Sequence, residues 1–362
     1  MTMAKRIRDL GIVLPGDPGP NNAITDVAGV AVGHHSIVRG HGKLIVGEGP
    51  VRTGVTAVLP RNRDASPVFA AGFSLNGNGE LTGMHWVEES GILHGPICIT
   101  NTHSVGAVHE AAIRWGNKHR GMDHMRFCLP VVGETYDGIL NDINGFHVRA
   151  EHVFRALDSA SEGRVAEGNV GGGTGMICHR FKGGIGTSSR RVVLDDHEYT
   201  LAVLVQANYG VRETLTIAGV PVGEEITDLM PQMDTGDTGS IIVIVACDAP
   251  LLPHQLKRIA RRVPMGMAKV GAYAGDGSGD IFLAFSTANA VGHERVAEVR
   301  MLANEQMDPL FLATVQATEE SILNALAAAE TMTGINDKTV YQLPQDRLLS
   351  IMKKYNRLSE DL

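Results

Sequence analysis

The sequence lacks the cysteine pairs that a disulfide framework or a zinc ribbon would need. Its 362 residues include only four cysteines, which are far apart and form no CxxC pair. Most of them lie in apolar, strand-like surroundings, as buried free thiols do. This pattern favours a reducing compartment. The four are Cys98, Cys128, Cys178 and Cys247.

An excess of positive charge is also absent. The formal net charge is -8 at pH 7, whereas a general nucleic-acid binder draws most of its non-specific affinity from a basic surface. One basic cluster, at residues 257–262, has helical spacing and is predicted to be the solvated face of a helix. We therefore expect no nucleic-acid partner.

Long apolar runs are missing too. No run approaches the roughly 18 residues that span a bilayer. The basic start of the chain, residues 1–8, is not followed by the roughly 7 to 15 apolar residues of a secretory signal. We expect a soluble, cytoplasmic protein with no membrane partner.

Metal-ligand spacing is a further absence. The sequence has 15 histidines but no HExxH motif or similar pattern, and scattered histidines are more often surface or hydrogen-bonded core residues. We predict no metal and no cofactor. The histidines of the first third are His34, His35, His41, His85, His94, His103 and His109.

A glycine-rich stretch at residues 168–175 could be mistaken for a phosphate-binding loop. It has no Lys-Ser/Thr tail, and residues 176–181 after it have the pattern of a strand rather than a helix. Nucleotide binding is therefore not expected. The stretch is predicted to be a tight turn between strands.

Groups of predicted strands alternate with pairs of predicted helices. Apolar runs predict strands at 27–32, 55–59, 97–100, 127–132, 199–206, 241–247 and 281–285. Helical spacing predicts helices at 105–115, at 153–160, at 253–270 with a kink at Pro264, and after a capping Asp308 up to Gly334. This order favours two stacked sheets with helices outside them. Length alone leaves one or two domains open.

The most informative stretch joins two glycine turns, at residues 234–239, to a serine and a buried strand. Gly239 lets the backbone bring its carbonyl against the Ser240 hydroxyl, which could then attack the preceding peptide bond. Hydrolysis of the resulting ester would leave Ser240 as a chain terminus, whose α-amine has a pKa of about 7.7 to 8.0. That is a nucleophile with its own base. The alternative is a simple turn with a local serine hydrogen bond.

Five other residues are candidates for catalysis or binding. Ser278 and Asp280 share one face of an extended segment, where they could relay a proton. Asn208, at a strand end, could donate to an oxyanion. Glu134 and Tyr136 follow a strand and could bind an ammonium group and an oxyanion, respectively. For each of them a turn or an exposed loop is the alternative.

These residues lie in motifs that resemble the L-aminopeptidase/D-Ala-esterase-amidase family, which includes the β-peptidyl aminopeptidases. The resemblance runs from about residue 7 to residue 351. Its motifs are Gly-Glu-Thr-Tyr-Asp-Gly at 133–138, Gly-Gly-Gly-Thr-Gly-Met at 171–176, Phe-Lys-Gly-Gly-Ile-Gly-Thr-Ser-Ser-Arg at 181–190, Gln-Ala-Asn-Tyr-Gly at 206–210, Gly-Ser at 239–240, Asp-Ala-Pro-Leu-Leu-Pro-His-Gln-Leu at 248–256 and Ser-Gly-Asp-Ile-Phe-Leu-Ala-Phe-Ser-Thr at 278–287.

The resemblance implies one α+β domain, a four-layer αββα sandwich like that of the N-terminal-nucleophile hydrolases but with distinct connectivity. It also implies self-cleavage between Gly239 and Ser240, giving an α chain of residues 1–239 and a β chain of residues 240–362. Four such αβ units would form a homotetramer.

The implied enzyme is a serine aminopeptidase or amidase that acts on small peptides, amides or esters with a free N-terminal amine. Ser240 would form an acyl-enzyme, with its own amine or the Ser278–Asp280 pair handling the proton. Asn208 and Tyr136 would stabilise the oxyanion, and Glu134 would hold the substrate's ammonium.

Members that act on β-peptides can have Glu where this chain has Asp280, so the choice among α-L, β and D residues stays open. Aminoacyl transfer in the same fold and a non-catalytic ligand-binding relative are the alternative functions.

Overall fold

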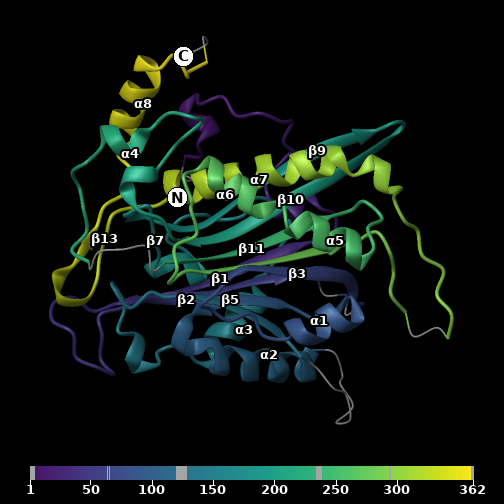
Figure 1. The fold of residues 1–362 in the computed structure, drawn as a ribbon. Coiled ribbons are helices and arrows are strands. Elements are labelled where there is room, and N and C mark those ends of the chain that lie inside the picture. The colour runs from purple at the N-terminus through teal and green to yellow at the C-terminus, as the bar shows by residue number, and fades with distance from the viewer. Residues whose placement is uncertain are drawn as a thin grey trace.

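The computed structural model describes residues 5–62, 64, 66–119, 129–233, 239–292 and 295–359. Cys128, most of the glycine turns before Ser240 and the first part of the strand predicted at 127–132 lie outside these residues. Within them, two sheets are stacked face to face and helices cover both outer faces (Figure 1). This is the predicted αββα arrangement.

The first sheet has four strands in the order β1-β2-β5-β6, and helices α2 and α3 cover its outer face. Side chains of alternate strand residues, such as Val55, Ala57 and Leu59, pack there against the helices. The bounds are β1 Ala31–Arg39, β2 Val51–Leu59, β5 Ile97–Asn101, β6 Val131–Thr135, α1 Met84–Ser90, α2 Val105–His119 and α3 Ala150–Asp158.

The second sheet has six strands in the order β4-β3-β12-β11-β10-β9, and helices α5, α6 and α7 lie on its outer face. All pairs are antiparallel except β11 with β12. The bounds are β3 Val68–Gly77, β4 Ile92–Leu93, β9 Gly184–Leu194, β10 His197–Asn208, β11 Ser240–Cys247, β12 Gly279–Ser286, α5 Pro253–Ala260, α6 Val263–Lys269 and α7 Asp308–Ala327.

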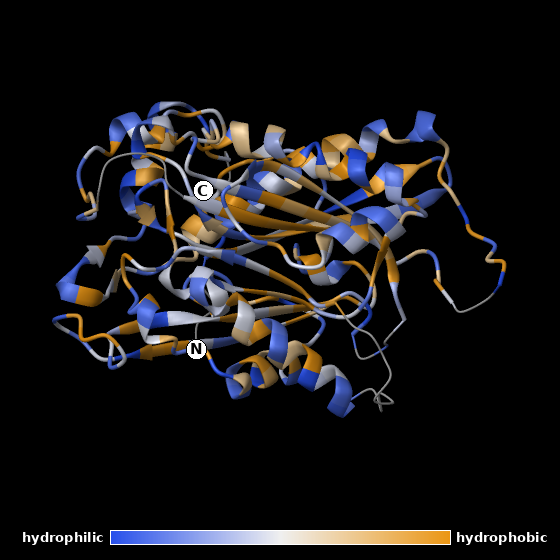
Figure 2. Ribbon diagram, turned by 60° about the horizontal axis from the view of Figure 1, so that its bottom comes forward, coloured by the Kyte–Doolittle hydropathy of each residue, from blue (hydrophilic) through white to orange (hydrophobic). Residues whose placement is uncertain are grey.

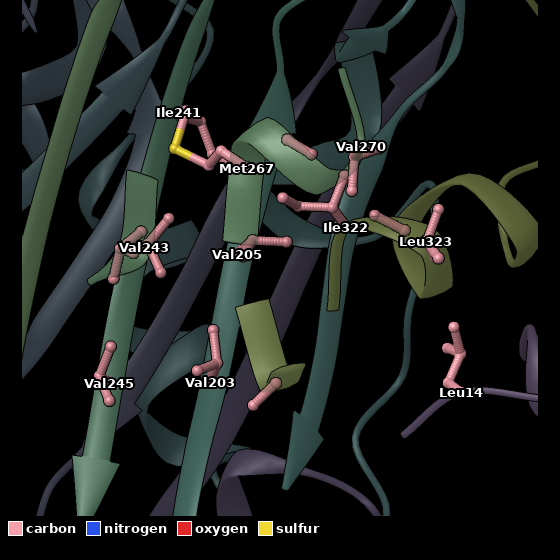
Figure 3. Close-up of a cluster of buried hydrophobic side chains, with 14 of the residues drawn as sticks. Leu14, Val203, Val205, Ile241, Val243, Val245, Met267, Val270, Ile322 and Leu323 are labelled. Carbon is pink, nitrogen blue, oxygen red and sulfur yellow. The ribbon is translucent and has the colours of Figure 1, made fainter. Parts of the chain in front are cut away.

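Strand β11 is buried along its whole length because it faces a core on both sides. Ile241, Val243 and Val245 belong to the core under the outer helices, where Met267 is one of their neighbours (Figure 3). The intervening residues, Ile242 among them, belong to the core between the two sheets. This explains the continuous apolar run in the sequence. Hydrophobic residues follow the strands of both sheets in the same way, whereas the helices alternate between hydrophobic and hydrophilic residues (Figure 2).

Two helix predictions need correction. The segment predicted as one kinked helix forms two helices, α5 and α6, and Pro264 lies in the first turn of the second. In the first turn of a helix the backbone N–H groups have no partner within the helix, so the N–H that proline lacks is not missed there. Pro264 therefore fits at the start of a new helix instead of bending a continuous one. In α7, Asp308 is the first helical residue rather than the cap, and the helix ends at Ala327, well before Gly334. The chain instead turns into a short hairpin.

The glycine-rich stretch contains a tight turn, as predicted, but the segment after it differs from the prediction. Residues Gly171–Gly175 form a buried 3-10 turn, and the segment after it is a hairpin of β7 and β8 rather than one strand. His179 and Arg180 at its tip have positive φ angles of 46° and 59°, as a two-residue hairpin turn requires.

Two strand boundaries differ as well. The strand predicted at 27–32 begins only at Ala31. The strand predicted at 127–132 overlaps β6, which spans Val131–Thr135 and so continues beyond the predicted end. The short elements are β7 Ile177–Cys178, β8 Phe181–Lys182, α4 Val222–Glu225, β13 Met332–Thr333, β14 Thr339–Val340 and α8 Gln345–Lys354. None of the helices in the described part of the chain is long and apolar enough to cross a bilayer.

Candidate active site

Ser240 is the first residue of β11 and is only 6% exposed. It lies opposite Asn208 in the antiparallel ladder with β10 and opposite Gly279 in the parallel ladder with β12. Residues two apart on a strand share a face, so the Ser240 side chain lies with that of Ile242, toward the first sheet. The side chain of Asn208 projects to the same face, directly across from the serine.

The Gly239–Ser240 peptide is held by one backbone donor. The Gly279 N–H points at both the Gly239 carbonyl oxygen, at 3.2 Å, and Ser240 Oγ, at 3.3 Å. A Cβ on Gly239 would collide with the Asn208 carbonyl oxygen and lie 2.5 Å from the Tyr209 Cα. The Ser240 hydroxyl and the Gly239 carbonyl therefore share one polarising N–H. Because of the collision, only glycine fits at residue 239.

The Asn208 amide has a fixed orientation. Its Oδ1 accepts a hydrogen bond from the Ile177 N–H at 2.8 Å, and its Nδ2 donates to the Tyr136 carbonyl oxygen at 3.0 Å. A backbone N–H can only donate and a carbonyl oxygen can only accept, so the amide cannot be reversed without losing both bonds. An amide nitrogen carries two N–H groups, and the carbonyl of Tyr136 uses one of them.

Tyr136 contacts Asn208 through its backbone rather than its phenol. The side chain is 44% exposed, and its ring lies over Gly138, where a Cβ would come within 3.0 Å of Tyr136 Cε1. Burial of the phenol, and then the nearby Asp137 carboxylate, raise its pKa. The phenol thus stays protonated and able to donate a hydrogen bond at neutral pH.

Glu134, at 3% exposure, is a buried carboxylate with only uncharged donors. Its Oε1 accepts from the Glu80 N–H at 3.0 Å and its Oε2 from the Thr102 hydroxyl. Burial raises its pKa, and these two hydrogen bonds oppose the shift. No ion pair to Glu134 occurs among the described residues. The site is therefore suited to a cation from outside the chain.

The Glu134 carboxylate lies close to β12, the strand paired with the start of β11. A Cβ on Gly79 would lie 3.1 Å from Glu134 Oε1 and 3.3 Å from the Gly279 Cα, so one glycine separates the carboxylate from the strand that flanks the serine. The absence of a side chain on Gly79 keeps this approach open.

Ser278 and Asp280 form a buried hydrogen-bonded pair. Ser278 Oγ donates to Asp280 Oδ1 at 2.7 Å, and Asn76 Nδ2 approaches Asp280 Oδ2 at 3.4 Å. In the parallel ladder Asp280 lies opposite Ile241, whose side chain faces the outer helices. The pair therefore lies on the opposite face of the sheet from the Ser240 hydroxyl, beside the start of β11.

Three contributors to this site have little signal in the sequence. Thr102 is a single polar residue directly after β5, Asn76 is a single polar residue near the end of β3, and the Gly279 N–H is a backbone group. The only hint is their position at strand ends that the fold brings together. Across the described part of the chain, no group of three or more His, Cys, Asp or Glu side chains could hold a metal ion.

The model of the family described as peptidase family S58 matches residues 22–340. The chain is 52% identical to the β-peptidyl aminopeptidase BapA of Sphingosinicella microcystinivorans over 98% of this chain and 93% of that protein. It is 48% identical to BapA of Sphingosinicella xenopeptidilytica over 96% and 91%.

Among solved structures, the L-aminopeptidase D-Ala-esterase/amidase of Ochrobactrum anthropi is 46% identical. The structural match covers 98% of this chain and 99% of that protein's chain, with a TM-score of 0.92. That protein is described as a prototype for the serine aminopeptidases and a new variant among the Ntn hydrolase fold. The predicted fold class is confirmed by this match.

Proposed function

Because this chain belongs to peptidase family S58 and is a serine-type aminopeptidase, we propose that Ser240 becomes its N-terminal nucleophile by self-cleavage. The observation that carries the proposal is the shared Gly279 N–H, which places the Ser240 hydroxyl beside the polarised Gly239 carbonyl. Attack of Oγ on that carbon transfers the acyl group from nitrogen to oxygen. Water then hydrolyses the ester and leaves chains of residues 1–239 and 240–362, which together form one αββα unit.

Cleavage frees two groups for catalysis. The α-amine of Ser240 ends the strand instead of projecting from one face, so it can reach its own hydroxyl on one side and the Ser278–Asp280 pair on the other. In the proposed reaction the neutral amine accepts the hydroxyl proton, and the pair orients the amine and shares its charge. The Gly279 N–H also loses its Gly239 partner and becomes a donor for the substrate.

The oxyanion of the tetrahedral intermediate would lie between Ser240 and Asn208. We propose that the second N–H of the Asn208 amide and the Gly279 N–H, which already points at Ser240 Oγ, donate to it. One such donor typically lowers the barrier by about 2.7 to 4 kcal/mol. The Tyr136 phenol, which is 44% exposed and lies at Gly138, is proposed to donate to the same oxygen after a rotation away from Gly138.

Substrates are proposed to be small peptides, amides or esters with a free N-terminal amine, on α-L, β or D residues. Glu134 would bind the ammonium, because this buried carboxylate forms no ion pair among the described residues and accepts hydrogen bonds there from the Glu80 N–H and the Thr102 hydroxyl. The need for that ammonium restricts cleavage to the first residue. Membership of the family favours hydrolysis over aminoacyl transfer or binding without catalysis.

We also propose that the processed units assemble as a homotetramer, as the sequence resemblance implies, which light scattering after size exclusion would test. The cytoplasmic location expected from the sequence stays a prediction. Three cysteines, Cys98, Cys178 and Cys247, are buried, which is consistent with it.

The test of processing is the intact mass of the denatured protein. Wild type should give two chains, the smaller beginning Ser-Ile-Ile-Val, and should hydrolyse aminoacyl anilides. Ser240→Ala should remain one inactive chain, whereas Ser350→Ala, at an exposed site on α8, should match wild type. A Ser240→Ala protein that still splits and still hydrolyses these substrates would refute the assignment.

A further inference from the structure

Lys182 is a completely buried lysine that the proposed reaction does not use. Its Nζ donates hydrogen bonds to three backbone carbonyl oxygens, at 3.2 Å to Gly173, 2.8 Å to Met176 and 2.8 Å to Gly183. An ammonium group has three N–H donors, and here each finds an acceptor. A charge buried so deeply is costly unless it is fully hydrogen-bonded or opposed by another charge.

One of these bonds leads directly to the oxyanion donor. The Met176 carbonyl that Lys182 binds and the Ile177 N–H belong to the same peptide group. That N–H donates to Asn208 Oδ1 at 2.8 Å, and Asn208 Nδ2 donates to the Tyr136 carbonyl at 3.0 Å. The Lys182 ammonium is therefore linked to the Asn208 amide by a continuous chain of hydrogen bonds through the Met176–Ile177 peptide.

Each link of such a chain strengthens the next. A cation on the Met176 carbonyl withdraws electron density from its peptide, so the Ile177 N–H becomes a better donor to Asn208. The bond to Oδ1 then polarises the Asn208 amide and makes its remaining N–H a better donor. Because all these groups are buried, water does not screen the effect.

The surroundings fix this chain in place. The Gly173 bond ties Lys182 to the buried turn Gly171–Gly175, and a Cβ on Gly175 would lie 2.8 Å from the Cβ of Asp137. The Asp137 carboxylate, next to Tyr136, opposes the lysine's charge. Burial lowers the pKa of Lys182 to about 7, and the nearby Cys178 and Asp137 oppose that shift.

We propose that Lys182 is a positioning residue for catalysis. By holding and polarising the Met176–Ile177 peptide, it orients the Asn208 amide toward the oxyanion and strengthens its hydrogen bond there. The inference rests on the oxyanion role proposed above for Asn208.

The primary test is Lys182→Met, which keeps an unbranched side chain but removes the charge and all three donors. A second variant, Lys182→Met with Asp137→Asn, leaves no unpaired charge and carries the test if the single variant does not fold. We expect kcat to fall about 10- to 100-fold, the usual cost of a hydrogen bond to a charged group, with KM unchanged within about threefold. Lys257→Met, on the exposed surface, controls for the loss of a lysine.

A double-mutant cycle with Asn208→Ala separates positioning from general damage. If Lys182 acts through Asn208, removing it from the Asn208→Ala enzyme should change kcat by less than about threefold. Full additivity, a KM rise as large as the kcat loss, or failure of both lysine variants to fold would overturn the inference. If Asn208→Ala itself leaves kcat unchanged, the oxyanion role proposed for Asn208 is wrong, and the lysine proposal that rests on it fails for that reason.

Discussion

Replacing Glu134 with glutamine should abolish recognition of the substrate's ammonium without disturbing the fold. Glutamine can keep both hydrogen bonds, with its oxygen accepting from the Glu80 N–H and its amide donating to the Thr102 hydroxyl. The single change is the loss of one negative charge. Glu134 therefore allows a clean test of the proposed binding site.

The expected magnitude follows from its burial. Two unit charges about 4 Å apart attract by about 4 kcal/mol at an effective dielectric constant of 20. At about 1.36 kcal/mol for each tenfold change, kcat/KM should fall by about 10³-fold. Much of the loss should be in KM, because the ammonium is bound in the ground state as well as in the transition state.

Stability should change in the opposite direction. Burial raises the folded-state pKa of Glu134 above its ordinary value of 4.5. The folded protein therefore binds this proton more readily than the unfolded chain, and the ionised carboxylate costs stability once the pH exceeds that ordinary value. Glu134→Gln removes this cost, so at pH 7 to 8 its melting temperature should equal or exceed that of wild type.

The assay compares an aminoacyl anilide with the matching acyl anilide that lacks the amine. Wild type should strongly prefer the first, and Glu134→Gln should lose that preference. Glu88→Gln, at an exposed position paired with Lys257, removes the same charge and should behave like wild type. If Glu134→Gln keeps both its KM and its preference for the free amine, the ammonium is bound elsewhere.

Three further changes test other parts of the structure. Asn208→Ala should lower kcat by about 10²- to 10³-fold in steady-state assays and leave KM nearly unchanged; an equal loss in KM would contradict the oxyanion role. Gly239→Ala should stay a single chain on denaturing gels, because its Cβ would collide with the Asn208 carbonyl. Burial lowers the pKa of His34 to about 4, so stability should fall as the pH drops from 6.5 toward 4. Urea unfolding at pH 7 and pH 5 should show a smaller drop for His34→Gln.

The layered fold was predictable because its signals are local. The continuous apolar run after Ser240 marks a strand that is buried on both faces. The i, i+2 spacing of Ser278 and Asp280 depends only on the alternation of side chains along an extended segment. The strand and the contact between these two side chains therefore appear where the sequence predicts them. The break between α5 and α6 was missed because Pro264 suits either a kinked helix or a new one, and packing decides between them.

The partners of the site residues were beyond sequence reasoning. Thr102 reaches Glu134, and Ile177 reaches Asn208, only because strand order brings their segments together. Lys182 lies in a motif quoted for the resemblance, yet its three acceptors are backbone carbonyls, which no side-chain pattern encodes. Roles that depend on backbone groups follow from the fold, not from residue types.

The position of Ser240 at the first residue of a strand explains why self-cleavage would be needed for catalysis. Its hydroxyl faces Asn208 between the sheets, while the Ser278–Asp280 pair faces the outer helices. Within a continuous strand the backbone nitrogen is an amide that cannot accept a proton, so the two faces stay chemically separate. Cleavage turns that nitrogen into an amine at the edge between them and releases the Gly279 N–H from Gly239. A precursor locked by Gly239→Ala should therefore lack aminopeptidase activity even with every catalytic side chain present.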